Sequence, residues 1–433
     1  MQRRAMFTDD FKDQPYWWEA APPEDARDAE LPRSVDVLVI GSGYTGLHAA
    51  LRTARAGRST LVLEAEALGY GASSRNGGQV STSIKPDFAA LKRKYGEQLA
   101  RGIIRDAQGS LDYLQSFITE EGIDCHLNVP GRFHGAHTAR QYDKLASYVA
   151  TLGDGIDTEA FLVPRAEQHA ELGTDAYHGG IVFPKHASVH PALYHKGLRD
   201  VVRAAGAQMI SHCRVTGIDR QAPGFRVSTA RGVVMARRVI VATNGYSSGL
   251  TPWHQRRVIP IGSYIIATEE LPKEVMDRLV PTNRVLSDTR KLVVYYRPSP
   301  DRKRILFGGR VSLKEMNPVV TGPRLKAMMV ALFPELEAVK ISHSWSGYVG
   351  YTFDTLMHCG QDDGLFYAMG YCGSGVGMAS YLGMKIGLQA ADDPAGETAF
   401  GKIPFPTRPF YTGNPWFLAP SVMVYRLRDR FDI

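Results

Sequence analysis

The sequence lacks the long apolar run that a membrane-spanning helix needs. Hydrophobic residues make up 44% of the 433 residues, yet no run approaches the roughly 18 consecutive apolar residues that cross a bilayer. Residues 1–13 are basic and then acidic, without the apolar core of a secretory signal. We therefore expect no membrane span and a cytoplasmic location.

Cysteine is scarce as well. Cys125, Cys213, Cys359 and Cys372 are scattered, and no two of them form a CxxC pair. This spacing excludes a disulfide framework and a redox-active cysteine pair. The histidines show no metal-ligand spacing, so we expect reduced thiols and no metal site.

Dense blocks of one charge are also missing. The chain has 51 Lys and Arg against 44 Asp and Glu, a net charge of +7. The basic residues are spread along the chain, and the densest runs, such as 302–304, have acidic or proline neighbours. A nucleic-acid-binding surface gathers its positive charge, so we expect no nucleic-acid partner. The mild excess suits an anionic cofactor and an anionic substrate.

Near the N-terminus the apolar pattern predicts a βαβ unit. Residues 35–40 form an apolar run of strand length that stops at Gly41. A helical segment over 45–56 ends at Gly57 and leads to a second apolar run, 60–63. Such a unit opens a parallel sheet.

The turn after the first strand carries the spacing GxGxxG at Gly41, Gly43 and Gly46. The first glycine allows a tight turn, the second lets a pyrophosphate approach the backbone, and the third lets helix and strand pack closely. Glu64 ends the second strand 18 residues beyond Gly46, where a carboxylate accepts ribose hydroxyls. A chance glycine turn with a surface glutamate is the alternative. The complete context predicts a dinucleotide site that also includes Tyr44, Thr45 and Ala65.

Two later turns distinguish FAD from NAD. Residues 238–245 form a strand that ends in the small-residue turn Ala242-Thr243-Asn244, and residues 370–377 form a glycine loop between a strand and a helix. A bare backbone there could contact a flat ring system, and the helix dipole would stabilise negative charge on a reduced flavin. Each turn alone could be ordinary, but together they indicate a flavin.

The rest of the chain alternates helices and strands. We predict helices over 89–121, 139–152, 191–205 and 378–391, and strands over 208–210, 224–229, 239–242, 259–268, 291–297, 304–308 and 365–369. The turn at 298–301 would join two of these strands as a hairpin. The pattern predicts an α/β fold in which a β-sheet domain is inserted into a discontinuous nucleotide-binding domain.

In this order, the segments GSGYTG, LEAEALGYGASSRNGGQV, VIVATNGY and GYCGSGVG resemble the D-amino-acid-oxidase class of FAD oxidoreductases. Within that class, Tyr16-Trp17-Trp18 and residues 71–79 resemble the gamma-glutamylputrescine oxidase group. The resemblance implies a glutathione-reductase-like FAD fold with a Rossmann-like domain and an inserted antiparallel β-sheet domain with helices. The expected divisions are an N-terminal lead, 1–33; an FAD-binding domain, 34–88, 179–250 and 356–400; a substrate domain, 89–178 and 251–355; and a C-terminal tail, 401–433.

The resemblance also implies where FAD is held. Beyond the glycine turn and Glu64, the expected contacts are Ser73, Ser74, Arg75, Asn76, Gly77, Gly78, Gln79, Val215, Ala242, Thr243, Asn244, Gly373, Ser374, Gly375, Val376 and Gly377. Arg75 would lie beside the flavin edge, unless it is a surface arginine. Members with covalent flavin carry a histidine where Ser74-Arg75 stands or a cysteine near 348–351. Both are absent, so we expect non-covalent FAD.

The sequence departs from the class where an α-amino acid would bind. Glycine and D-amino-acid oxidases carry Gly-Leu-Arg-Pro before the last strand, and that arginine binds the α-carboxylate. The matching stretch here is Gly347-Tyr348-Val349-Gly350, so a primary or secondary amine fits better. Leu306 stands where monomeric sarcosine oxidase has an oxygen-activating lysine, so either O2 or another acceptor would reoxidise the flavin.

An aromatic pocket would suit an amine. The candidate substrate residues are Tyr264, Tyr296, Trp345 and Tyr351, with Arg310 to hold an anionic tail and with Tyr295 and Tyr371 nearby. Packing in an aromatic core, or for Arg310 a place at a strand end, is the alternative for each.

The expected activity is FAD-dependent oxidation of an amine that is gamma-glutamylputrescine-like or otherwise carries a distal anionic group. Hydride would pass from the α-carbon of the free-base amine to flavin N5, and the imine would hydrolyse to an aldehyde. The alternatives are a flavin dehydrogenase that feeds a quinone or a protein acceptor, an amino-acid oxidase, and a non-enzymatic flavin-binding protein.

Overall fold

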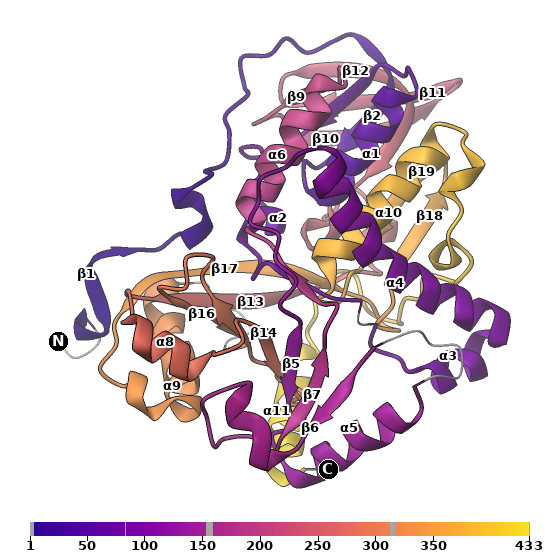
Figure 1. Ribbon diagram of the computed structural model, residues 1–433. Coiled ribbons are helices and arrows are strands. Elements are labelled where there is room, and N and C mark those ends of the chain that lie inside the picture. Colours follow the sequence, from indigo (N-terminus) through magenta and orange to yellow (C-terminus); the bar gives the residue numbers. More distant parts are fainter. Residues whose placement is uncertain (1–3, 83, 153–158, 312–316, 433) are drawn as a thin grey trace.

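Two β-sheets organise the protein, one of eight strands and one of nine, with helices packed on both. A computed structural model describes residues 4–82, 84–152, 159–311 and 317–432. The two sheets occupy different halves of the molecule (Figure 1). The fold is therefore of the mixed α/β class that the sequence predicts.

The eight-stranded sheet has a parallel centre. Its central strand is β2 (Ser34–Ile40), which pairs with β3 (Thr60–Leu63) and with β12 (Gly232–Val241). The other parallel members are β9 (Gln208–Ile210) and β19 (Leu365–Met369); β10 (Val215–Gln221), β11 (Gly224–Thr229) and β18 (His358–Asp362) add antiparallel pairs. In the register, Ile40 lies between Leu63 and Val241. The three central strands thus end at one edge, where ligands bind in open parallel sheets.

The predicted βαβ unit is confirmed, with helix α1 (Tyr44–Arg55) between β2 and β3. Helix α10 (Gly375–Ala390) packs against α1 so closely that a Cβ on Gly383 would lie 2.6 Å from the Thr45 carbonyl oxygen. Helix α6 (Pro191–Ala204) also contacts α1. The single helix predicted over 89–121 is wrong, because Gly96, at φ +82°, separates α3 (Phe88–Tyr95) from α4 (Glu97–Glu120).

The nine-stranded sheet has the order β1-β17-β13-β16-β15-β14-β5-β7-β6. Its pairs are antiparallel except β1 with β17 and β14 with β5. The strands are β1 (Phe7–Lys12), β5 (Arg132–Gly135), β6 (Phe161–Val163), β7 (Gly180–Phe183), β13 (Ile259–Thr268), β14 (Val285–Asp288), β15 (Tyr295–Pro298), β16 (Ile305–Gly309) and β17 (Ile341–Tyr351). The predicted hairpin is confirmed as β15 and β16, although 291–294 lie outside the strand. Helix α9 (Pro318–Leu332) packs on this sheet. Four shorter helices are α2 (Ala72–Arg75), α5 (Ala139–Ala150), α7 (Pro252–Gln255) and α8 (Lys273–Leu279). Two short strands, β4 (Gln79–Val80) and β8 (Ala187–Ser188), pair with each other.

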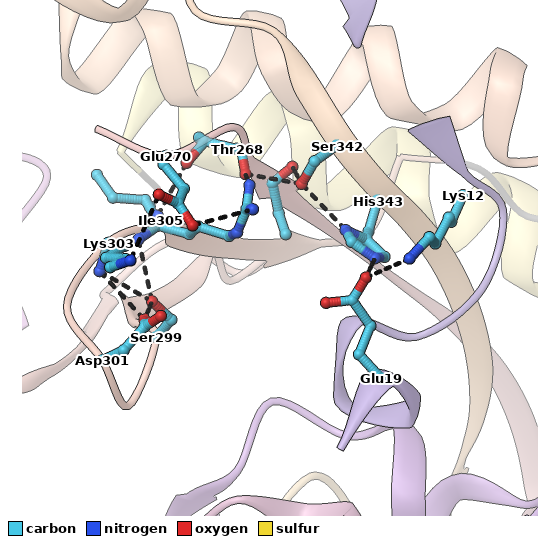
Figure 2. Close-up of polar contacts among 12 residues, drawn as sticks. Lys12, Glu19, Thr268, Glu270, Ser299, Asp301, Lys303, Ile305, Ser342 and His343 are labelled. Carbon is cyan, nitrogen blue, oxygen red and sulfur yellow. Dashed lines mark hydrogen bonds and ion pairs between the residues drawn. The ribbon is translucent and has the colours of Figure 1, made fainter. Parts of the chain in front are cut away.

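The N-terminal segment is tied to this sheet by polar contacts. Lys12 donates to the Glu19 carboxylate at 2.5 Å, and the same oxygen lies 3.2 Å from His343 Nε2 on β17 (Figure 2). Ser342 Oγ lies 3.0 Å from His343 Nδ1 and donates to the Thr268 carbonyl oxygen at 2.7 Å. The first part of the segment expected as a polar lead is therefore tied to the nine-stranded sheet, whereas Glu24 pairs with Leu68 beside the eight-stranded sheet.

Two further differences concern domain divisions. Strand β7 pairs within the nine-stranded sheet, although the expected division at residue 179 places it with the FAD-binding domain. The expected tail contains a helix that the sequence analysis missed, α11 (Leu418–Phe431). None of the helices in the described ranges is long and apolar enough to cross a membrane.

Candidate active site

A cavity of about 1790 Å³ lies between the two sheets. Its wall includes the edge where β2, β3 and β12 end, together with residues of β13, β14, β15 and β17. A site for one drug-sized ligand takes roughly 300–1,000 Å³. The cavity therefore has room for a dinucleotide and a second, smaller molecule.

The glycine turn forms one end of the cavity. Gly41 has φ +106°, a conformation that favours glycine, and a Cβ there would lie 3.0 Å from the Ala242 carbonyl oxygen. Helix α1 begins at Tyr44, and its N-cap residue Gly43 has no side chain to cap it; the Tyr44 N–H donates to Ser73 Oγ at 2.9 Å. An uncapped helix N-terminus with a bare backbone is a good site for a phosphate.

Glu64 lies at the same edge, at the end of β3. Its carboxylate accepts hydrogen bonds from the Ser42 N–H at 3.0 Å and from Ser42 Oγ at 2.8 Å. The Ser42 carbonyl oxygen in turn accepts from His195 Nε2 at 2.7 Å, which places the ring proton on Nε2. Burial lowers the pKa of His195 to about 4, so this histidine is neutral. Sequence reasoning missed His195, because a lone histidine on a helix carries no signal of its own.

Most of the expected FAD contacts line the cavity. They are Gly41, Gly43, Tyr44, Thr45, Glu64, Ala65, Ser73, Arg75, Asn76, Gly77, Gln79, Val215, Ala242, Thr243, Asn244, Gly373, Ser374, Gly375 and Val376. These residues come from segments far apart in the sequence, and the fold brings them to one surface.

Four expected FAD contacts are closely packed and do not line the cavity. A Cβ on Gly46 would lie 1.9 Å from the Gly41 carbonyl oxygen, so this glycine permits α1 to meet β2. The buried Ser74 hydroxyl donates to the Gly69 carbonyl and accepts from Trp18 Nε1. The four residues are Gly46, Ser74, Gly78 and Gly377.

Three tryptophans hold the segment 74–76 beside the cavity. Trp17 Nε1 donates to the Asn76 carbonyl oxygen, and Trp18 Nε1 donates to Ser74 Oγ, both at 2.8 Å. Trp345 Nε1 donates to the Arg75 carbonyl oxygen at 2.8 Å. Each indole N–H of these side chains therefore has a defined acceptor on or beside helix α2.

The Arg75 side chain is also held in place by several contacts. Its guanidinium lies 4.9 Å from the Trp18 ring centroid and 4.5 Å from that of Tyr70. One guanidinium nitrogen donates to the Ser346 carbonyl oxygen at 2.9 Å. Arg75 thus presents a fixed positive charge at the cavity wall rather than a mobile surface charge.

Two expected substrate residues, Tyr264 and Tyr296, lie in a hydrophobic core instead of the cavity wall. Side chains alternate along a strand, and on β13 Ser263 and Ile265 face the cavity while Tyr264 points to the opposite face. Tyr296 likewise stacks on Phe307. Sequence reasoning identified aromatic strands but not which face of each is buried.

The remaining candidates, Trp345, Tyr351, Arg310, Tyr295 and Tyr371, line the cavity. The Arg310 guanidinium lies 4.7 Å from the Tyr351 ring centroid. Burial raises the pKa of Tyr295 to about 12, and its hydroxyl lies 2.8 Å from Ser263 Oγ. Tyr295 is therefore a neutral hydrogen-bonding group.

Val349 and Leu306 occupy the positions where the sequence departs from the class. Val349 lines the cavity. Leu306 is buried in a cluster that also contains Trp17, Ile265 and Trp345. Leu306 therefore places an apolar side chain behind the part of the cavity wall that Ile265 and Trp345 form.

The wall away from the glycine turn is strongly cationic. Asp288 is the one carboxylate on that part of the described wall, and it pairs with Arg290. Burial raises the pKa of Asp288 to about 6 against the opposing effect of Arg290. Burial, with Arg132 and Lys85 nearby, lowers the pKa of His134 to about 3, so this ring is neutral. The cationic residues are Lys85, Arg132, Arg290, Lys291, Arg310, Arg324 and Arg428; all except Arg310 escaped sequence reasoning, because they are scattered along the chain.

Comparison with known proteins agrees with this geometry. The model of the family "FAD dependent oxidoreductase" matches residues 36–387. The chain is 31% identical over 403 residues to gamma-glutamylputrescine oxidoreductase from Escherichia coli, covering 92% of this chain and 93% of that protein. Among solved structures, glycine oxidase from Geobacillus kaustophilus has a TM-score of 0.72 at 21% identity, covering 87% and 99% of the two chains. L-proline dehydrogenase from P. horikoshii has a TM-score of 0.71 at 16% identity, covering 90% and 99%. The chain belongs to the D-amino-acid-oxidase family of FAD-dependent oxidoreductases.

Proposed function

We propose that this enzyme oxidises a primary or secondary amine that carries an anionic group at its far end. The observation that carries the proposal is the cationic wall beside the expected flavin position. Such a wall attracts an anionic molecule and repels a simple alkylammonium ion. The 31% identity to gamma-glutamylputrescine oxidoreductase supports an amine of that kind without naming it.

The residues at the edge of the parallel sheet suit FAD. The bare backbone at Gly41 and Gly43 and the start of α1 would hold the pyrophosphate, and Glu64 would accept the ribose hydroxyls. The Gly373–Val376 loop and the start of α10 would face the flavin ring. FAD, when bound, accepts the hydride equivalent from the carbon beside the amine nitrogen, and the imine product hydrolyses to an aldehyde.

The protein's own residues would orient the amine and keep it deprotonated. Only the free base has a lone pair that assists hydride loss from the adjacent carbon. The positive charges of Arg310 and its cationic neighbours disfavour a second positive charge on the substrate, which lowers the pKa of the bound amine. Trp345 and Tyr351 exclude water from the reacting carbon, and Arg310 is placed to bind an anion.

An amine lacking an α-carboxylate is favoured by Val349. The side chain at this position in α-amino-acid oxidases is an arginine that forms a bidentate pair with the carboxylate, and valine has no hydrogen-bond donor. Arg310 is the alternative anchor if the substrate proves to be an amino acid.

A second candidate, a dehydrogenase that passes electrons to a quinone or a protein, is favoured by Leu306. Its apolar side chain, buried beside Trp345, offers no positive charge to stabilise reduced oxygen. Stopped-flow reoxidation of the reduced enzyme by O2 separates the two: slow reoxidation supports the dehydrogenase. The buried thiols of all four cysteines are in keeping with the cytoplasmic location that we propose.

Anaerobic bleaching of the flavin tests the proposal. Amines with a distal carboxylate should reduce the flavin faster than D-alanine or glycine, and the rate should rise with pH as the bound amine loses its proton. Faster bleaching by D-alanine than by every amine in the panel would replace the amine oxidase with an amino-acid oxidase.

A further inference from the structure

We propose that the C-terminal helix α11 closes the substrate cavity and that Arg428 on this helix binds the anionic end of the substrate. This inference rests on the proposed function and extends it, because it assigns the residues that bind the distal anion. Figure 1 shows α11 at the end of the molecule away from the FAD-binding sheet. In the expected divisions this segment belongs to the C-terminal tail, 401–433.

Helix α11 forms part of the cavity wall. Its lining residues are Leu418, Ala419, Ser421, Val422, Met423, Tyr425 and Arg428. Most of them recur at intervals of three or four residues, which places them along one side of the helix, and Ala419 and Met423 flank that side. From Leu418 to Arg428 the lining extends for about 15 Å along the helix. Helix α11 is thus a long wall of the cavity.

The start of α11 is packed against the chain that follows β17. Phe417 lies 6.0 Å from Phe353 and 5.7 Å from Tyr411 between ring centroids. The Tyr411 hydroxyl donates to the Val258 carbonyl oxygen at 2.8 Å. This aromatic cluster holds the first turn of the helix beside the wall formed by Phe353 and its neighbours.

The end of α11 is held by two aspartates. The Asp429 carboxylate accepts from the backbone N–H of Lys291 at 2.7 Å and of Leu292 at 3.1 Å. The Asp432 carboxylate accepts from Thr138 Oγ1 at 2.5 Å and from Gln141 Nε2 at 2.6 Å, at the start of helix α5. A carboxylate at a helix N-terminus is also favoured by the helix dipole. Both ends of α11 are therefore tied to other elements.

Three cationic side chains next to these contacts line the cavity, namely Arg290, Lys291 and Arg428. Asp429 fixes the backbone of Lys291, whose neighbour Arg290 also lines the cavity. Arg428 directly precedes Asp429 and lines the same cavity. Arg290 is already paired with Asp288. A guanidinium binds carboxylate with fork-like geometry, so Arg428, with Lys291 nearby in the wall, suits a carboxylate or a similar anion.

The test compares 5-aminopentanoate with pentylamine, which differ in the distal carboxylate. The ratio of kcat/KM for the two amines measures how strongly the anion is recognised. Arg428→Gln should lower this ratio about tenfold or more, mainly through KM for 5-aminopentanoate. Lys402→Gln is the matched control, because Lys402 is exposed, pairs with Glu397 and lies outside the cavity wall. An unchanged ratio in Arg428→Gln would overturn the proposal.

A second variant tests the closure without touching Arg428. Asp429→Ala should increase hydrogen–deuterium exchange over 418–431 and lower the same ratio. If the amides of α11 exchange freely in Asp429→Ala but the ratio of kcat/KM for the two amines is unchanged, α11 does not help to bind the distal anion. If no amine reduces the wild-type flavin, the proposed function fails, and binding of the unreactive dicarboxylate glutarate then decides this inference separately. Glutarate should perturb the flavin absorbance, and Arg428→Gln should weaken that binding; equal binding to both proteins would refute the assignment of Arg428.

Discussion

Glycines of the turn after β2 serve different purposes, although all three belong to one motif. A Cβ on Gly46 would meet the Gly41 carbonyl oxygen at 1.9 Å, and backbone cannot move aside cheaply. A Cβ on Gly43 would meet only Ser73 Oγ, at 3.0 Å. The first glycine to mutate for a test of the cofactor site is therefore Gly43.

Gly43→Ala should weaken FAD binding while the apoprotein keeps its thermal stability, because the added methyl group would obstruct the bare backbone at the start of α1 and would meet only the Ser73 hydroxyl. Gly46→Ala should destabilise the apoprotein itself, because helix and strand can no longer approach. Fluorescence titration with FAD and thermal unfolding of the apoproteins measure the two effects. Full flavin occupancy in Gly43→Ala would show that the cofactor lies elsewhere.

His195 makes stability depend on pH. Its pKa is about 4 in the folded protein because of burial, against about 6.5 in an unfolded chain. The unfolded chain therefore binds the extra proton, and the free energy of unfolding falls as the pH drops from about 6.5 to about 4. At pH 5 this single group should cost about 2 kcal/mol.

His195→Gln keeps a donor for the Ser42 carbonyl oxygen but does not titrate. Between pH 7.5 and pH 5 the variant should lose less thermal stability than the wild type. The buried His190 and His254, whose pKa values burial also lowers to about 4, remain in both proteins and serve as the background. If the two proteins lose equal thermal stability, burial does not lower the pKa of His195 in the folded protein.

At the scale of elements, the N-terminal segment acts on the site through its indoles. Trp17 is fully buried and donates to the Asn76 carbonyl oxygen. Trp17→Phe removes this donor and leaves a void, so it should lower stability by roughly 1–3 kcal/mol. It should also shift the flavin absorbance, because residues 75–77 line the cavity. Trp416→Phe is the control, since Trp416 is 64% exposed. An unshifted flavin spectrum in Trp17→Phe would show that Trp17 does not position residues beside the flavin.

Elements with a strong local signal could be predicted from the sequence, and short pairings could not. The βαβ unit has an apolar strand, a glycine turn and a helix whose stop is Gly57, so each boundary has a local cause. Strands β5, β6, β7 and β14 are three or four residues long. They form because distant segments supply hydrogen-bond partners, which no local pattern records. Helix α11 was missed because Pro420 and the charged residues near its end resemble a loop.

At the scale of the molecule, the cofactor end could be predicted better than the substrate end. The expected FAD contacts belong to motifs with fixed spacing around the ends of β2, β3 and β12, and most of them line the cavity. The substrate wall depends on which strand face is buried, and this is why Tyr295 lines the cavity while Tyr296 lies in the core. Its cationic residues come from separate elements and meet only through the tertiary fold.

The residues around the cavity predict that FAD is bound without a covalent link to the protein. The segment near Ser74 and the strand end at 348–351 contain no histidine or cysteine. Cys372 lies in the glycine loop, but burial raises the pKa of its thiol to about 11, so it is not a thiolate that could attack the flavin. The purified protein should therefore be yellow, and heat or acid should release its FAD into the supernatant.

Because FAD would contact residues from distant segments, its removal should also lower the midpoint of thermal unfolding. A ligand that binds only the folded state adds about 2.7 kcal/mol at 100 times its Kd. Melting curves at increasing FAD concentration should therefore shift steadily upward, whereas a covalent flavoprotein would show no such dependence. Flavin that remains with the precipitated polypeptide would disprove non-covalent binding, and loss of that flavin in Cys372→Ser would then identify the attachment point.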